Sequence, residues 1–217
     1  MRSRHCIVKI CLLLTLALPA ATSRAVVVWD SSSNGPLSAS GSAPTPFTLF
    51  AGTNSIISTV GGSNHQNWVV MTVPSGFELD RLVLANFQST DRQGFTGVQR
   101  GTSFVGSIDN PASYLGYTHF GTGATNGSLP ATNLVGTDVL PLMGDNGFNG
   151  TAPGSQGFTP PLPSGSYVFL IQQGGATTTY QYDFDVTRIP EPGGLPLLGA
   201  AGALLFRLPR KYALSRR

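Results

Sequence analysis

Few side chains in this sequence have the chemistry needed for catalysis or for holding a metal ion. Both cysteines, Cys6 and Cys11, lie close to the N-terminus, and His65 and His119 are far apart in the chain. A serine nucleophile needs a histidine and a carboxylate beside it, and zinc needs three or four converging ligands. The sequence contains neither a Gly-x-Ser-x-Gly elbow nor a Gly-x-x-x-x-Gly-Lys phosphate loop. It therefore predicts no metal, no cofactor and no catalytic residue.

Two carboxylates near the end of the middle region offer a weaker alternative. Asp183 and Asp185 alternate with aromatic residues, so they share one face of a predicted strand. Calcium binds carboxylate oxygens, but it takes six or more of them. The favoured interpretation is a solvated sheet face.

Aromatic side chains that bind sugar rings by stacking are a second kind of candidate. Tyr114, Tyr117 and Phe120 lie close together between turn-forming residues, where side chains are commonly exposed. They are the predicted carbohydrate contacts, and exopolysaccharide is the partner they suggest. Trp68 lies inside an apolar run and is expected in the core.

The N-terminus has the three-part pattern of a secretory signal peptide. Residues 1–9 carry basic groups and no acid, residues 10–21 are mostly apolar, and small residues follow at Ser23 and Ala25. Cleavage is expected between Ala25 and Val26 by signal peptidase, with cleavage before Arg24 as the alternative. Both cysteines would leave with this leader, so the exported chain would contain no thiol.

The C-terminus also has three parts. Pro190, Glu191 and Pro192 precede an uncharged run over residues 193–206, and a basic cluster follows at Arg207, Arg210 and Lys211. Fourteen residues are short for a stable membrane span, and basic residues favour the cytoplasmic side. This pattern predicts a short transmembrane helix that serves as a temporary anchor in the inner membrane.

The order of these three parts resembles the PEP-CTERM sorting signal of Gram-negative bacteria. The resemblance covers about 28 residues. It implies that an exosortase, a membrane transpeptidase-like enzyme, cuts near Pro190, Glu191 and Pro192 and passes the protein toward the cell surface or the extracellular matrix. A plain C-terminal membrane anchor is the alternative.

The charges are divided among these regions. The chain has 13 Lys and Arg against 10 Asp and Glu, a formal net charge of +3. Most basic residues lie in the two terminal segments, and the middle holds four arginines, nine acids and no lysine. The basicity therefore belongs to the ends, which excludes a nucleic-acid-binding middle domain.

The middle region, residues 26–189, reads as short strands between turns rich in glycine and proline. Strands are predicted over residues 26–29, 47–50, 55–60, 68–73, 77–87, 167–172 and 177–187, with edge pieces near 95–99, 114–120 and 139–143. Together they predict an all-β fold, an antiparallel β-sandwich with a jelly-roll-like arrangement.

Finer features follow from the alternation of apolar residues. Tyr180, Tyr182, Phe184 and Val186 are expected to face the core. A change of phase within residues 77–87 predicts a bulge near residues 80–81, and residues 173–176 form a hairpin-sized turn. Residues 167–172 are apolar on both faces, as in a central strand. Residues 121–165 have few apolar pairs. They are expected to form a surface insertion, or to contain short strands that the pattern does not reveal.

A second resemblance concerns this middle region. Segments 58–62, 68–76, 162–169 and 180–184 together look like the bacterial pre-peptidase C-terminal (PPC-type) β-sandwich. Such domains accompany secreted proteins without being catalytic, so the resemblance implies a fold and no activity.

The sequence therefore predicts three parts: a signal peptide (1–25), an exported β-rich domain (26–189) and a PEP-CTERM segment (190–217). The predicted function is that of a non-enzymatic surface or matrix protein. A carbohydrate-binding module for exopolysaccharide is the alternative, and an unrecognised secreted hydrolase is the third hypothesis.

Overall fold

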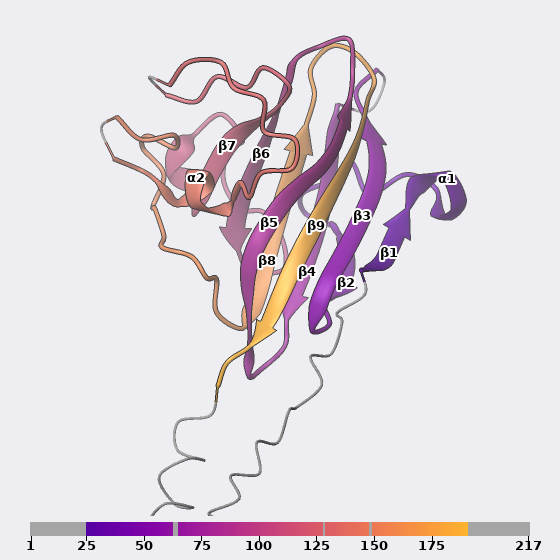
Figure 1. Cartoon of the computed structure of the whole chain (residues 1–217), viewed down its shortest axis with the longest axis vertical. Helices are drawn as coiled ribbons and strands as arrows, with labels where there is room; N and C mark the ends of the chain where they lie inside the picture. Colours follow the sequence, from indigo (N-terminus) through magenta and orange to yellow (C-terminus); the bar gives the residue numbers. More distant parts are fainter. Residues whose placement is uncertain (1–24, 63–64, 128, 148, 191–217) are drawn as a thin grey trace, which may run out of the picture.

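Nine strands in two sheets form the body of the described chain, which in this computed structural model comprises residues 25–62, 65–127, 129–147 and 149–190 (Figure 1). One sheet has the order β1 (Val26–Asp30), β3 (Gly52–Val60), β9 (Thr178–Arg188), β5 (Phe77–Gln88). The other has the order β2 (Thr45–Thr48), β4 (Gln66–Val73), β8 (Gly165–Gln172), β6 (Gln93–Arg100), β7 (Gly116–Gly121). Three short helices, α1 (Ser31–Asn34), η1 (Pro111–Ser113) and α2 (Leu140–Gly144), lie between strands. The all-β prediction is confirmed.

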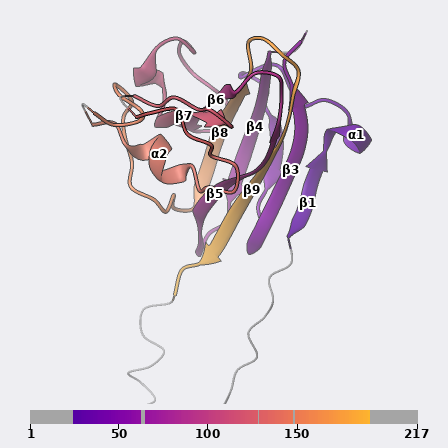
Figure 2. The same cartoon turned by 45° about the horizontal axis from the view of Figure 1, so that its top comes forward.

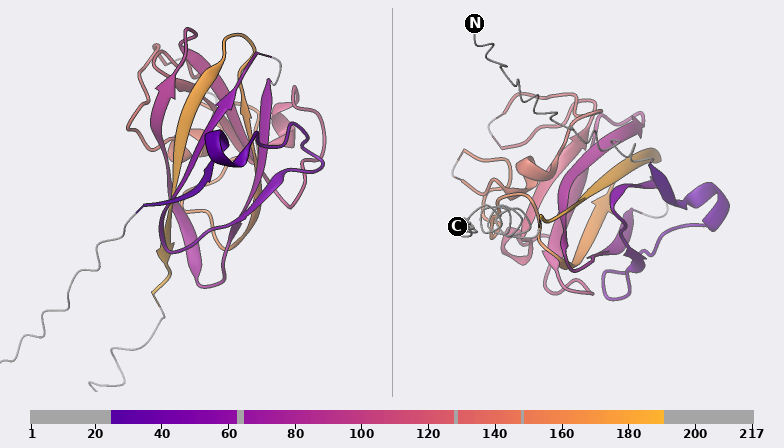
Figure 3. Two further views of the ribbon diagram at one scale, coloured as in Figure 1. Left: turned by 90° about the vertical axis from the view of Figure 1, so that its right-hand side faces the viewer. Right: turned by 60° about the horizontal axis from the view of Figure 1, so that its bottom comes forward.

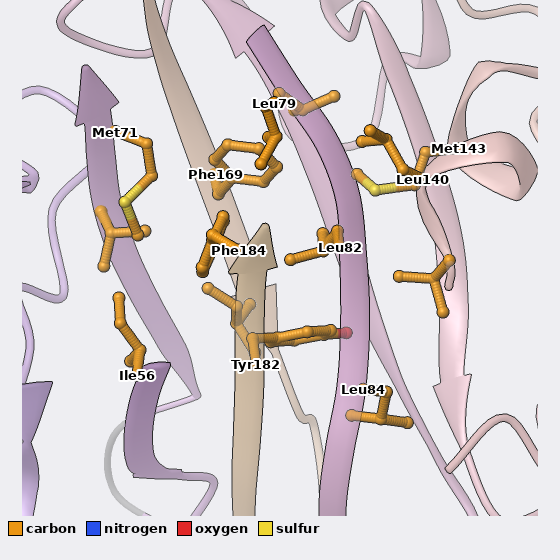
Figure 4. Close-up of a cluster of buried hydrophobic side chains, with 14 of the residues drawn as sticks. Ile56, Met71, Leu79, Leu82, Leu84, Leu140, Met143, Phe169, Tyr182 and Phe184 are labelled. Carbon is orange, nitrogen blue, oxygen red and sulfur yellow. The ribbon is translucent and has the colours of Figure 1, made fainter. Parts of the chain in front are cut away.

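The two sheets pack face to face around an aromatic and aliphatic core (Figure 4). Phe169 of β8 and Phe184 of β9 meet edge to face, with ring centroids 5.4 Å apart. Tyr180, Tyr182, Phe184 and Val186 are all buried, as the alternation along β9 predicts. Burial of such large side chains from both sheets stabilises the domain without a disulfide.

β8 carries apolar side chains to both of its faces. Tyr167, Phe169 and Ile171 join the inner core, and Val168 and Leu170 join a second apolar cluster on the outer face of the same sheet. β8 lies between β4 and β6, so the prediction of a central strand is confirmed. Trp68 also belongs to the outer cluster and is buried.

The prediction of a purely antiparallel sandwich is wrong at two edges. β1 runs parallel to β3, and β2 runs parallel to β4. The first four strands alternate between the two sheets, so each edge strand pairs with the strand two places later in the sequence. Both sheets are therefore mixed.

The predicted bulge is present, and the predicted hairpin is not. The β5–β9 register shifts between Leu79 and Arg81, and shifts again between Leu84 and Asn86. Residues 173–176 instead link β8 in one sheet to β9 in the other. Among these residues, neither Gly174 nor Gly175 has the positive φ that a primed hairpin turn requires.

An edge strand is predicted near residues 139–143, but residues 140–144 form helix α2 and Val139 is the residue that precedes it. Pro141 stands in the first turn, where a missing N–H costs nothing. Leu140 and Met143 share one helix face and are buried.

The long segment 121–165 covers the free edges of β5 and β7. Gly136 and Val139 donate backbone hydrogen bonds to β5 at Leu84 and Leu82, each 2.8 Å. On the other sheet, Leu134 donates to Gly121 of β7 at 2.9 Å. The segment, which includes helix α2, lies beside β7 in two views (Figures 1 and 2). The segment that was expected to form a surface insertion therefore protects the outer edges of β5 and β7.

Candidate functional site

The last described strand ends just before the predicted sorting motif. β9 ends at Arg188, and the Ile189 N–H donates to the Gly76 carbonyl oxygen at 2.9 Å. Pro190 follows and is exposed. Glu191, Pro192, Arg207, Arg210 and Lys211 lie outside the described residues, so their predicted roles stay predictions. Among the described residues, the last backbone hydrogen bond to the sandwich comes from Ile189, so a cut after Pro190 leaves every described contact in place.

The first strand begins at the predicted leader cleavage site. Ala25 precedes β1, and Val26 is its first residue. Val26 pairs with Asn54, and Asn54 pairs with Phe184 near the end of β9. The N-terminal start of β1 and the C-terminal exit of β9 therefore lie at the same end of one sheet (Figure 3).

The predicted carbohydrate contacts divide between the two faces of the second sheet. Tyr114 and Tyr117 lie on the outer face, where they line a depression with Phe95, Ile108 and Pro111, and with Asp109. Its volume is about 170 Å³. Phe120 lies on the inner face, is 0% exposed and packs against Tyr182. A side chain without accessible surface cannot stack on a sugar, so the structure removes Phe120 from the set.

The rings of the depression pack against one another. Phe95 lies 5.7 Å from Tyr114 and 5.6 Å from Tyr117 between ring centroids. The Tyr114 hydroxyl donates to the Ile108 carbonyl at 2.9 Å, and the Tyr117 hydroxyl donates to the Pro153 carbonyl at 2.6 Å. These bonds hold both phenols. Tyr114 is 2% exposed, so of the two tyrosines only the half-buried Tyr117 offers ring surface to a ligand.

Two glycines of β6 make room for these aromatic residues. A Cβ on Gly97 would lie 2.5 Å from the Tyr114 ring on the outer face. A Cβ on Gly94 would lie 2.7 Å from the Phe120 ring on the inner face. The sequence reasoning missed this role. The signal was available, because glycine inside a strand marks a close approach of other groups.

Charge at the depression is negative. Asp109 is its only charged lining residue, and no described cation forms a salt bridge with it. Burial, with the Asp109 charge adding to it, raises the pKa of Tyr114. Burial alone raises the pKa of Tyr117. Both phenols are therefore neutral at physiological pH.

The two histidines among the described residues, His65 and His119, are in separate surroundings. His119 on β7 contacts the Phe95 ring at 5.8 Å between centroids. Burial lowers the pKa of His119, opposed by hydrogen bonds with the Thr125 backbone and the Asn126 side chain. His65 Nδ1 lies 3.3 Å from the Gln173 carbonyl oxygen. Within the described ranges, neither histidine is hydrogen-bonded to a serine or a carboxylate.

The carboxylates of β9 are bound by neighbouring side chains. Asp183 accepts hydrogen bonds from Ser55 at 2.7 Å and from Gln181 at 2.9 Å. Asp185 accepts from Thr53 at 2.6 Å and forms a 2.6 Å salt bridge with Arg81. In the part of the chain that the structure describes, no group of three or more His, Cys, Asp or Glu is placed to hold a metal ion.

A second hollow, about 210 Å³ in volume, was not anticipated. It lies within the edge-covering segment and is lined mainly by apolar side chains, including Leu129, Leu134, Pro141 and Leu142. Its walls come from helix α2 and from loops without periodic pattern, so the sequence gives no signal for it.

Comparison with protein-family models finds no match for this chain, and comparison with curated proteins finds none either. Among the described residues, no helix has both the length and the apolar character needed to cross a membrane.

Proposed function

We propose that this chain is an exported, non-enzymatic surface or matrix protein that is sorted through its C-terminal PEP-CTERM segment. The observation that carries the proposal is the order of motif, apolar run and basic cluster over residues 190–217. In this account, signal peptidase cuts between Ala25 and Val26, and residues 193–206 hold the chain briefly in the inner membrane. An exosortase then cuts near Pro190, Glu191 and Pro192, which sends the β domain to the cell surface or beyond.

The position of the chain ends supports this route. Within the described ranges, the last backbone hydrogen bond to the sandwich comes from Ile189, next to the motif. Both ends of the domain emerge on one side, so a leader and a tail can occupy one membrane while the sandwich folds outside it. The jelly-roll-like arrangement and the PPC-type resemblance stay part of the proposal.

Substitution of the motif tests the route. In a host with an exosortase, Glu191→Ala together with Pro192→Ala should leave the protein in the membrane fraction, while the unchanged chain reaches the surface or medium. Glu78→Ala is the matched control, because it removes an acid from the folded domain instead. Equal release of the motif variant and the control would contradict the proposal.

A second candidate is carbohydrate binding at the aromatic depression. The observation that favours it is the pair of half-buried rings, Phe95 and Tyr117, around a volume near 170 Å³ with a carboxylate at its rim. Aromatic faces stack on the apolar faces of sugar rings. The Asp109 charge would repel acidic polysaccharides and favour neutral or amine-bearing ones.

The test is titration of purified protein with neutral, amine-bearing and acidic oligosaccharides. Tyr117→Ala should weaken binding at least tenfold, and Phe50→Ala, a 61% exposed aromatic residue away from the depression, should not change it. Absence of binding across all three classes would overturn this candidate and leave the sorting proposal intact.

A further inference from the structure

One end of the sandwich, the lower end in Figure 1, is made of short loops without charge. Strand pairing brings these loops together, because β3 and β5 both begin opposite the end of β9, and β4 ends opposite the start of β8. We call this surface the uncharged end, and it consists of residues 49–51, 74–76, 163–164 and 189–190.

The charges of the domain lie mostly away from the uncharged end. The charged residues described within two positions of its loops are Glu78 and Arg188, one of each sign. The domain as a whole has nine acids and four arginines. Its excess of negative charge therefore belongs to other parts of the surface, and the uncharged end does not repel an anionic partner.

Phe50 is an exposed aromatic residue of the uncharged end. Its side chain is 61% exposed, whereas Leu49 before it is 0% exposed and belongs to the core. The buried Asn54 side chain fixes the loop, because its Oδ1 accepts from the Phe50 N–H at 2.9 Å and its Nδ2 donates to the Phe50 carbonyl oxygen at 2.8 Å. The backbone of Phe50 is thus held from the inside, and its ring is left outside.

Two further apolar side chains are exposed close to Phe50. Ile189, which follows β9, is 39% exposed, and Val26, the first residue of β1, is 50% exposed. Val26 pairs with Asn54, the residue that holds the Phe50 loop. Exposed apolar surface therefore gathers where charge is absent, and such surface is typical of a contact site.

From this end we infer that the anchored chain rests its domain on the membrane, with Phe50 in the lipid headgroup layer. The inference rests on the proposed anchor at residues 193–206. The partner of the uncharged end is then the surface of the same phospholipid bilayer that holds the anchor.

The length of chain between the domain and the anchor supports this contact. Four Cα–Cα steps lead from Ile189 to Gly193, so the two residues are at most about 14 Å apart. The headgroup layer on each side of a bilayer is about 5–8 Å thick. Even a fully extended linker therefore keeps Ile189 within about 10 Å of the headgroup surface.

The short anchor brings the domain closer still. Residues 193–206 number fourteen, which as a helix would measure about 21 Å, against about 30 Å for the hydrocarbon core. A short span is accommodated by a thinner bilayer and by drawing its flanking residues into the interface. The loops beside Ile189 then meet the headgroups.

The contact depends on the tail. Even a myristoyl chain gives only marginal, reversible membrane binding, and one phenylalanine with two aliphatic side chains buries less apolar surface than that. The domain should therefore leave the membrane when the tail is cut, so that one cleavage ends both the anchor and the contact.

Quenching of a fluorophore by labelled lipid tests the contact. After leader removal the full chain has no cysteine of its own, so Ala51→Cys places one label beside Phe50. The labelled chain is reconstituted in vesicles of phosphatidylethanolamine and phosphatidylglycerol that include a headgroup-spin-labelled lipid. Quenching should be at least fivefold stronger than at Thr90→Cys, because Thr90 is exposed beyond the other end of the 12-residue β5, about 35 Å away.

A second pair of variants tests the role of the aromatic ring. Phe50→Ser should at least halve the quenching at position 51, because it removes the side chain that enters the headgroup layer. Leu129→Ser is the matched control, since it removes a 49% exposed apolar side chain from segment 121–165, and it should change nothing. Equal quenching at positions 51 and 90, or no effect of Phe50→Ser, would overturn the inference.

Flotation of the same vesicles separates this inference from the proposed function. A chain that floats with the vesicles but shows no quenching at position 51 would overturn the contact and leave the anchor standing. A chain that does not float would overturn the anchor and the contact together. Processed protein that stays on the vesicles after the cut would contradict the dependence on the tail.

Discussion

Two tyrosines of β9 show how much a single hydrogen bond matters in this core. Tyr180 and Tyr182 point to the same side of the strand and are 0% and 1% exposed. The Tyr180 hydroxyl accepts from Asn67 Nδ2 at 3.0 Å. The Tyr182 hydroxyl is buried without a hydrogen-bond partner among the described residues. A buried polar group without a partner lowers stability.

Replacing each tyrosine with phenylalanine should therefore have opposite effects. Tyr180→Phe leaves the Asn67 amide without that acceptor and should lower the free energy of unfolding by about 1–2 kcal/mol. Tyr182→Phe removes an unpaired hydroxyl and should leave stability unchanged or raise it by up to about 1 kcal/mol. Urea unfolding followed by fluorescence measures both, and equal losses would contradict the assignment of partners.

Buried phenols also predict the response of the domain to alkali. Burial raises the pKa of five described tyrosines, Tyr114, Tyr117, Tyr167, Tyr180 and Tyr182, above their usual 10.0. Above about pH 10 the folded state therefore holds more protons than the unfolded state, so stability falls as pH rises. Tyrosinate absorbance should appear together with unfolding. Ionisation of most phenols near pH 10 in a still-folded domain would contradict their burial.

At the scale of elements, alternation and turn residues predicted most of the strands. The period-two pattern of β9 and the phase change within β5 each depend on local sequence, and both the buried face and the bulge at residues 79–81 are present. Turn residues flank Tyr114 and Tyr117, and the structure places both rings at one depression, while a sugar contact there stays a prediction. These features need no knowledge of distant partners.

The errors concern choices made by distant contacts. Gly174 and Gly175 suggest a hairpin, but β8 is already paired with β4 and β6, so β9 enters the other sheet. Residues 139–143 suit a strand by composition, yet packing of Leu140 and Met143 favours a helix turn.

The error at Phe120 has a local cause instead. Phe120 follows Tyr117 by three residues, and in a strand that spacing places it on the opposite face.

Close packing between α2 and β7 gives a prediction at this scale. A Cβ on Gly116 would lie 2.0 Å from the Met143 carbonyl oxygen, whereas a Cβ on Gly174 would meet nothing within 4 Å. Gly116→Ala should therefore lower stability by about 2 kcal/mol or more, and Gly174→Ala should have little effect. Thermal unfolding of the two variants compares them directly, and similar midpoints would contradict the close approach.

For the whole molecule, the distribution of charge gives a test of the proposed export route. The full chain has a net charge of +3 and an isoelectric point near 9.1. The domain between the two cuts keeps four arginines and nine acids, so the exported product should be anionic. Isoelectric focusing of surface material should give a value below neutrality, and a value above it would show that the basic ends are retained.

The central claim is that both ends are removed around an intact sandwich, and intact mass spectrometry of the exported protein tests it most directly. The account predicts a chain that begins at Val26 and ends near Pro190 or Pro192, with or without a group added by transfer. A surface protein whose mass includes residues 193–217 would contradict it.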